Sequence, residues 1–179
     1  MLDRMPLTDA QVEDFAKYAR NPETWVLAAR RSLAVARLLR ERADDLVHTT
    51  NRDFFEFSGC HYAGYFHAAM AVENALKAAL ISRDPTIVEN GALNIRKFGS
   101  KSGHALLDSA VMVLGSLTHE ERRLLTKLEE YVWAGRYTVP TKGDVFYDHD
   151  RMNNLRTSTA DEASILQSLV ERTISHVGK

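Results

Sequence analysis

The feature that most constrains this chain is an apolar run between Gly59 and Asp84, GCHYAGYFHAAMAVENALKAALISRD. Its alanine, aromatic and aliphatic side chains cover nearly every direction around a helical axis, and no proline interrupts it before Pro85. A helix that is apolar on most sides must be covered on most sides. The run therefore predicts a long central helix against which other helices pack.

Helical periodicity recurs on both sides of this run. Three helix starts show a capping-box pattern, at Thr8 with Gln11, at Thr118 with Glu121, and at Thr159 with Glu162. The dipeptide Asn21-Pro22 predicts a further start, with Asn as the cap and Pro at the first helical position. Helices are therefore expected over residues 8–20, 22–46, 102–115, 118–135 and 159–177.

The segment 22–46 repeats apolar or small residues at alternating spacings of four and three, which predicts a seam that packs on another helix. The seam residues are Trp25, Ala29, Ser32, Ala36, Leu39, Ala43 and Leu46. Phe54, Phe55 and Phe57 either anchor the connection that follows or extend the central helix backwards. The connection 85–101 is expected to hold a turn or two of helix, and 136–158 is irregular.

These segments predict an all-α fold of five or six helices, with a four-helix core and one or two extra short helices. The whole chain, 1–179, is expected to form a single domain with its bundle core at about 22–177. The formal net charge is −1, so there is no overall field that would attract nucleic acid or an anionic membrane. One cysteine, Cys60, fits a reducing compartment, and no segment suggests a signal peptide or membrane span, so a cytoplasmic location is expected.

A polar edge runs along the expected central helix. His67, Asn74 and Lys77 are seven and ten residues apart, which places them on one side, and Glu73 can reach Lys77 one turn away. Such an edge is either a ligand site or the ordinary solvent-facing side of a buried helix. His104, at a helix start, either favours an anion or caps its own loop.

The helix 22–46 also carries a basic face. Its arginines are Arg30, Arg31, Arg37, Arg40 and Arg42, and only Glu41, Asp44 and Asp45 near its end oppose them. This face is either an electrostatic footprint for RNA or DNA, or a solvated surface.

Three segments resemble the HEPN domain family of helical bundles. The string AVENALKAALI resembles the family's second long helix, GHALL at 103–107 resembles the opening of its third, and GRY at 135–137 with Pro140 resembles a segment after its fourth. The matches follow the family's order between Trp25 and about Pro140. The resemblance implies an up-and-down four-helix bundle, commonly a homodimer. It also implies a link to RNA cleavage in toxin and defence systems, to nucleotide binding, or to a nucleotidyltransferase partner in a toxin-antitoxin pair.

Ribonuclease members of that family carry an Arg followed after four to six residues by a His, near the start of the last helix. Here the expected place, 151–158, contains Arg151 but no histidine. Arg172 and His176 are one residue too close, and the only formal match, Arg42 with His48, lies at the wrong helix. A non-catalytic binding module is therefore the first hypothesis.

The resemblance and the polar edge together predict a ligand site for RNA or a nucleotide. Its expected residues are His67, Asn74, Lys77, His104, Arg136 and Tyr137. Lys77 and Arg136 would meet phosphate, Tyr137 would stack, and His67 and Asn74 would hydrogen-bond. As a ribonuclease, the protein would instead use His67 or His104 as general acid or base and Arg136 or Arg151 at the phosphate.

No cofactor or metal is expected. A di-iron bundle needs Glu-x-x-His pairs, and no histidine here has a glutamate three residues before it. The acidic stretch Asp144, Asp148, His149 and Asp150 could hold a divalent cation but is more simply a solvated loop.

Overall fold

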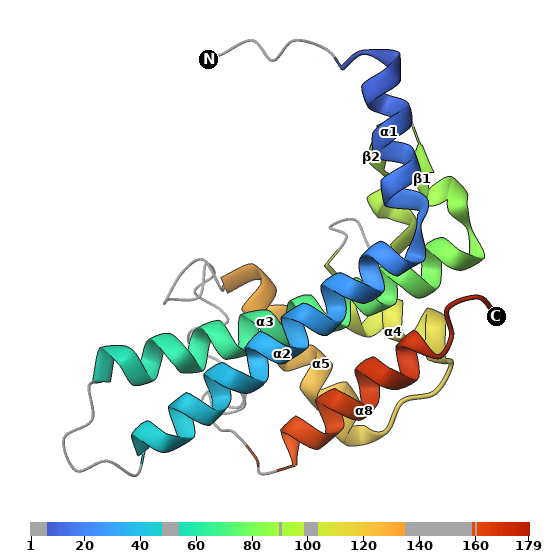
Figure 1. The fold of residues 1–179 in the computed structure, drawn as a ribbon. Coiled ribbons are helices and arrows are strands. Elements are labelled where there is room, and N and C mark those ends of the chain that lie inside the picture. Colours follow the sequence, from blue (N-terminus) through green and yellow to red (C-terminus); the bar gives the residue numbers. More distant parts are fainter. Residues whose placement is uncertain (1–6, 48–53, 90, 99–103, 135–158, 160) are drawn as a thin grey trace.

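The computed structural model describes residues 7–47, 54–89, 91–98, 104–134, 159 and 161–179 (Figure 1). Six α-helices lie in this part of the chain: α1 (Asp9–Arg20), α2 (Pro22–Val47), α3 (Phe54–Arg83), α4 (Leu106–Leu114), α5 (His119–Ala134) and α8 (Glu162–Ile174). The predicted all-α fold class is confirmed.

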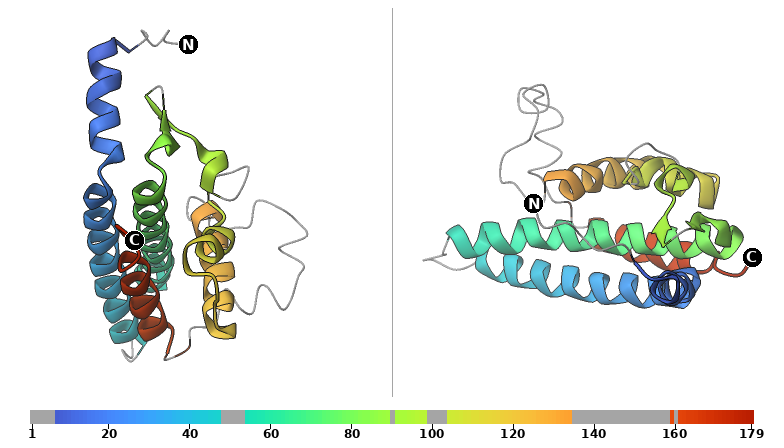
Figure 2. Two further views of the ribbon diagram at one scale, coloured as in Figure 1. Left: turned by 90° about the vertical axis from the view of Figure 1, so that its right-hand side faces the viewer. Right: turned by 90° about the horizontal axis from the view of Figure 1, so that it is seen from above.

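The helix α3 is the centre of the arrangement. It packs against α2 along most of its length and also contacts α4, α5 and α8. Figure 2 shows α2 on one side of α3, the α4 and α5 pair on the other, and α8 beneath them. The up-and-down four-helix core stays a prediction, because the segment that joins α5 to α8 lies outside the described residues.

Small side chains allow the close approach of α2 and α3. Ala69, Ala71, Ala75, Ala78 and Ala79 are fully buried. A Cβ added at Gly64 would lie 3.6 Å from the Cβ of Leu39 and 3.8 Å from the carbonyl oxygen of Ala36, so there is no room there for a large side chain. From Ala68 to Ile81 the helix is covered on nearly all sides, as its composition predicts.

The predicted seam of α2 faces α3. Its alanines at 29, 36 and 43 and Leu46 are buried, and Trp25, Ser32 and Leu39 are half-buried. Trp25 also donates its indole N–H to the carbonyl of Ala19 at 2.8 Å, which fixes the corner between α1 and α2. The seam is confirmed.

Two of the three predicted capping boxes are present. The side chains of Thr8 and Gln11 cap α1, and those of Thr118 and Glu121 cap α5. The predicted cap at Thr159 is wrong: α8 starts at Glu162, with Asp161 before it and no side-chain cap. The carboxylate of Glu162 instead pairs with Lys127 inside the protein, so it is not available to cap a helix.

Two other helix starts differ from the sequence pattern. The central helix begins at Phe54 rather than Gly59, so the phenylalanines extend it backwards, which was one of the two alternatives. The helix expected from 102 begins at Leu106. It ends as predicted before Gly115, whose φ of +74° few other residues adopt.

The connection after α3 holds two short 3₁₀ turns, Pro85–Ile87 and Ile95–Phe98, as expected. Between them lies a two-stranded hairpin that was not predicted, with β1 (Val88–Glu89) antiparallel to β2 (Ala92–Leu93). Its signal is the dipeptide Asn90-Gly91, a common hairpin turn, and Gly91 has a φ of +72°.

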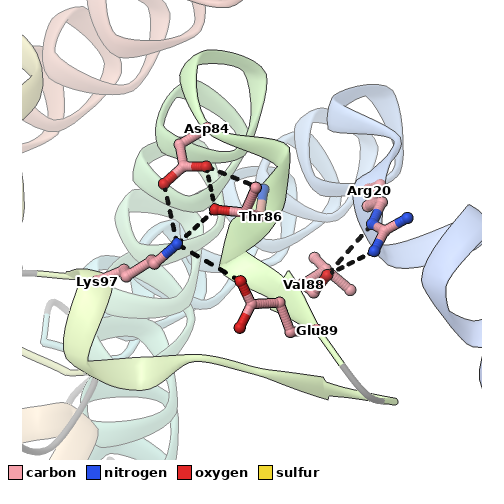
Figure 3. A network of polar contacts seen from close by, with 6 residues as sticks. All are labelled: Arg20, Asp84, Thr86, Val88, Glu89 and Lys97. Atoms are coloured by element: carbon pink, nitrogen blue, oxygen red, sulfur yellow. Dashed lines mark hydrogen bonds and ion pairs between the residues drawn. The ribbon is translucent and has the colours of Figure 1, made fainter.

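Polar contacts tie this hairpin to its surroundings (Figure 3). The Lys97 ammonium lies 3.2 Å from a carboxylate oxygen of Asp84 and 3.8 Å from one of Glu89. Asp84 also accepts hydrogen bonds from the backbone and hydroxyl of Thr86. Arg20 of α1 donates twice to the carbonyl of Val88, which holds α1 against the hairpin.

None of the described helices combines the length and the apolar character that crossing a bilayer requires.

The close packing of α3 leads to a first prediction. Ala75→Leu adds three carbons at a fully buried position, so it should lower the free energy of unfolding by about 1–3 kcal/mol. The matched control is Ala163→Leu at an exposed position on α8, which should change stability little. Urea denaturation measures both, and equal stability of the two variants would show that the core around Ala75 is loose.

The hairpin network leads to a second prediction. Hydrogen bonds from Thr86 and the ammonium of Lys97 hold the pKa of Asp84 below its ordinary value. A carboxyl group with a lowered folded-state pKa stabilises the fold above its unfolded pKa, and this stabilisation disappears as the pH falls through the folded-state value. Hydrogen exchange at the Asn94 amide, which bonds to Ile87, reports on the hairpin.

Protection of the Asn94 amide should fall as wild-type protein is acidified through the carboxyl range. Asp84→Asn should reduce it already at neutral pH, whereas Glu89→Gln should have a smaller effect because its contact with Lys97 is longer. Wild-type protection in the Asp84→Asn variant at neutral pH would contradict this account.

Candidate functional site

Two of the predicted site residues meet at a buried carboxylate. Glu73 on α3 is 4% exposed and pairs through one oxygen with the Lys77 ammonium, one turn further along the helix. Its other oxygen lies 2.9 Å from Nδ1 of His104, which precedes α4. The Glu73–Lys77–His104 cluster therefore joins α3 to the start of α4.

Aromatic rings enclose the lysine of this cluster. The Lys77 ammonium lies 5.3 Å from the ring centre of Trp25 and 5.9 Å from that of Phe98, distances at which a cation is attracted to a ring face. Its side chain is only 15% exposed, whereas that of His104 is 40% exposed. Solvent therefore reaches the cluster mainly at the histidine.

A small recess opens beside the cluster. It has a volume of about 10 Å³, enough for one water molecule. Its lining residues are Glu73, Leu76, Lys77, Phe98, Ala105, Leu106 and Ser109. The recess is too small for a nucleobase, so only one polar group of a larger ligand could enter it.

Among the described residues, two other predicted site residues, His67 and Asn74, have no hydrogen bond or ion pair to the cluster. His67 is half-buried with its ring 5.7 Å from that of Phe66, and Asn74 is buried with no polar contact within the described residues. Their spacing still places both on the same side of α3 as Lys77. Arg136, Tyr137 and Arg151 lie outside the described residues.

Sequence reasoning identified the Glu73–Lys77 pair but missed the rings of Trp25 and Phe98 and the bond to His104. The Glu73–Lys77 pair lies within one helix, and its i,i+4 spacing can be recognised in the sequence. The bond from His104 to Glu73 spans 31 residues, and no local pattern indicates it.

The cluster has features of an acid–base site. A carboxylate that accepts a hydrogen bond from one imidazole nitrogen orients the ring. Lys77 adds a positive charge beside it. Among the described residues, no group of three His, Cys, Asp or Glu side chains is arranged to hold a metal ion, and the acidic stretch 144–150 lies outside them.

Arginine and histidine meet elsewhere. Arg83 at the end of α3 lies 3.2 Å from Nδ1 of His176, which follows α8. Arg83 also donates to the carbonyls of Met112 and Val113 in the last turn of α4. The C-terminal ends of α3, α4 and α8 meet here, and helix C-termini attract cations. The Arg83–His176 pair therefore has a structural role that does not require a phosphate.

A second buried network includes Tyr65, which lies nearer the N-terminal end of α3 than Glu73. The Lys127 ammonium on α5 is 0% exposed and lies 3.1 Å from Glu162 and 2.8 Å from the hydroxyl of Tyr65. Tyr65 in turn donates to Glu162. Three helices are thus joined at one point, and no local sequence pattern indicates this junction.

The surroundings of this network are apolar and aromatic. Burial lowers the pKa of Lys127 against the opposing effect of Glu162, and burial raises the pKa of Tyr131, whose ring stacks on Tyr65. Burial and the nearby Lys127 charge lower the pKa of His61. Because the Lys127 ammonium is shielded from solvent, its role is to hold the helices together rather than to meet a ligand.

The basic face of α2 is neutralised at one end only. Arg42 pairs with Glu56 at 2.6 Å, and Arg40 donates to the carbonyl of Thr159. Arg30 and Arg31 are exposed, with no ion pair to the described residues.

The buried network leads to a third prediction. Lys127→Met leaves the Glu162 carboxylate buried without its cation, which should cost about 3–5 kcal/mol of the free energy of unfolding. The double variant Lys127→Met with Glu162→Leu removes both charges and should recover most of that loss. Thermal and urea denaturation of both variants measure this, and a double variant as unstable as the single one would show that packing, not charge, dominates.

Comparison of the chain with protein-family models, with curated proteins and with solved structures finds no match.

Proposed function

We propose that the protein is a HEPN-like helical binding module without catalytic activity, and that its ligand is an RNA or a nucleotide whose phosphate meets the Glu73–Lys77–His104 cluster. The observation that carries this proposal is the sharing of one buried carboxylate between two basic side chains. Lys77 and His104 both have N–H groups that can donate to a phosphate oxygen. His104 is the member that solvent reaches.

The size of the recess supports a ligand that lies mostly on the surface. One phosphate oxygen could take the place of a water molecule there, while the remainder extends over the outside. The edge of α3 that carries His67 continues from Lys77 and offers a half-buried imidazole to such a ligand, whereas Asn74 on the same edge is buried.

The absence of catalysis is inferred from where arginines lie. The segment 151–158 contains Arg151 but no histidine, and the pair of Arg83 with His176 has a structural role. In-line attack by a ribose hydroxyl needs both a proton-transfer group and a charge that stabilises the phosphate.

One observation favours a second candidate, a metal-independent endoribonuclease. The bond between Glu73 and His104 orients the imidazole as a general acid or base requires, and Lys77 could substitute for the arginine. A role as the structural partner of a nucleotidyltransferase in a toxin-antitoxin pair is implied by the family resemblance alone.

Binding of a fluorescent mixed-sequence RNA and of labelled ATP, measured by anisotropy in EDTA, tests the proposal. His104→Gln should weaken binding about tenfold, because a charge-assisted hydrogen bond is worth roughly 1.5–3 kcal/mol. The matched control is His119→Gln, an exposed histidine at the start of α5, which should bind like wild type.

The same samples, analysed on a gel, separate the two candidates. Intact RNA with binding that depends on His104 supports the binding module, whereas cleavage that disappears in His104→Gln and Glu73→Gln supports the ribonuclease. Failure of wild-type protein to bind either probe, or equal binding by the His104 and His119 variants, would remove the cluster from consideration.

A further inference from the structure

The side-chain amide of Asn74 on α3 differs from the other buried polar groups. Seven polar or charged residues in the described part of the chain are buried: Glu73, Asn74, Ser109, Glu121, Lys127, Glu162 and Thr173. Six of them are bonded, either to a charged side chain or, for Ser109 and Thr173, to a backbone carbonyl. Asn74 is 7% exposed and has no hydrogen bond to any described residue.

An amide that is buried without a partner destabilises the folded state. Burial removes water from its N–H donors and its carbonyl acceptor, and no described residue replaces the lost hydrogen bonds. Asparagine is also a poor helix former, and the buried positions around it on α3 are filled by residues such as Ala71, Leu76 and Ala78. An apolar side chain would suit this position in the fold better, so the amide indicates a role in binding.

Asn74 lies at the border between the covered and the open sides of α3. Its neighbours one turn away are Ala71 and Ala78, which are buried, and Met70 and Lys77, which are half-buried. Residues three positions apart on a helix have their Cβ atoms about 5–6 Å apart, so Asn74 and Lys77 start side by side. A ligand group that reaches Asn74 from the open side therefore passes next to the lysine of the Glu73–Lys77–His104 cluster.

The small exposed fraction of Asn74 limits which chemical group can reach it. A planar base is too large to approach a side chain that is 7% exposed, whereas one hydroxyl group is small enough. An amide both donates and accepts hydrogen bonds, and so does the ribose 2′-hydroxyl. In RNA this hydroxyl belongs to the sugar directly next to a phosphate, which matches the position of Asn74 next to Lys77.

We propose that Asn74 determines specificity for ribose: its amide hydrogen-bonds to the 2′-hydroxyl of a ligand whose phosphate meets Lys77 and His104. The site then selects ribonucleotides over deoxyribonucleotides. This inference rests on the proposed function, since it needs the phosphate at the Glu73–Lys77–His104 cluster. It assigns the sugar contact to Asn74, and with it the discrimination between RNA and DNA.

The expected discrimination follows from the state of the amide without ligand. A 2′-hydroxyl supplies the missing partner, whereas a deoxyribose leaves Asn74 as unbonded as it is in the free protein. One hydrogen bond to an otherwise unpaired buried group corresponds to about a tenfold difference in dissociation constant.

Fluorescence anisotropy in EDTA tests the inference, with a labelled mixed-sequence RNA and with DNA of the same sequences in which uracil replaces thymine. Labelled ATP and dATP form a second pair of probes. Wild-type protein should bind the ribose member of each pair about tenfold more tightly. Asn74→Leu, which keeps the branching of the side chain, should bind both members with the wild-type affinity for the deoxyribose form. Asn74→Ala should do the same without added methyl groups.

Urea denaturation of the free protein gives a result that does not depend on any ligand. Asn74→Leu and Asn74→Ala should each unfold at a urea concentration at least as high as wild type, because each replaces an unpartnered buried amide by a better helix former. A residue with only a structural role would instead lose stability on substitution and would weaken RNA and DNA binding equally. The matched control is Gln167→Leu, which removes an exposed amide on α8 and should keep the stability and the ribose preference of wild type.

Equal binding of RNA and DNA by wild-type protein would overturn the inference, as would a ribose preference that persists in both Asn74 variants. Lower stability of both variants would also contradict it, because the amide would then have a partner in the fold. Absence of wild-type binding to all four probes would remove the proposed function and, with it, the phosphate on which this inference rests. That result differs from binding without a ribose preference, which overturns the role of Asn74 alone.

Discussion

The burial of α3 between Ala68 and Ile81 is the constraint on which the rest of the structure depends. A helical segment covered on nearly all sides within a chain of this length needs neighbours at close range, and its alanines and Gly64 permit that range. The cost is that α3 itself contributes few large side chains to the core. Leucines and valines from α4, α5 and α8 fill the remaining space. Apolar packing alone therefore brings these three helices against α3.

Burial of α3 also decides what happens to its polar residues. Glu73 lies on a face that the neighbouring elements cover, and an unpaired carboxylate there would be strongly destabilising. It is satisfied from its own helix by Lys77 and from outside by His104. Tyr65, two turns earlier, is satisfied by Lys127 and Glu162. Each polar group therefore also fixes where another helix lies, because only one docking position completes its hydrogen bonds.

Contacts between residues a few positions apart and contacts between distant segments differ in how well the sequence predicts them. The helices, the α2 seam, two capping boxes and the stop at Gly115 were predicted because each depends on residues a few positions apart. The bond of His104 to Glu73 and the pair of Lys127 with Glu162 join residues 31 and 35 positions apart, and nothing local distinguishes these side chains from solvated ones. The wrong cap at Thr159 has the same origin: the local pattern was correct, but a distant lysine uses Glu162. The hairpin was missed although its Asn-Gly signal was present, because its two-residue strands are too short to show alternation.

The two buried lysines show how the same chemistry supports different roles. Lys77 and Lys127 each pair with a glutamate and lie near aromatic rings. Lys127 has no exposed surface and its partner begins a helix, so any ligand that displaced it would first have to undock α8. Lys77 retains some exposure, and its glutamate is shared with a histidine that solvent reaches. A ligand could therefore compete for this carboxylate's partners without separating any helices, and for this reason the cluster at Glu73, rather than the larger network at Lys127, is the candidate site.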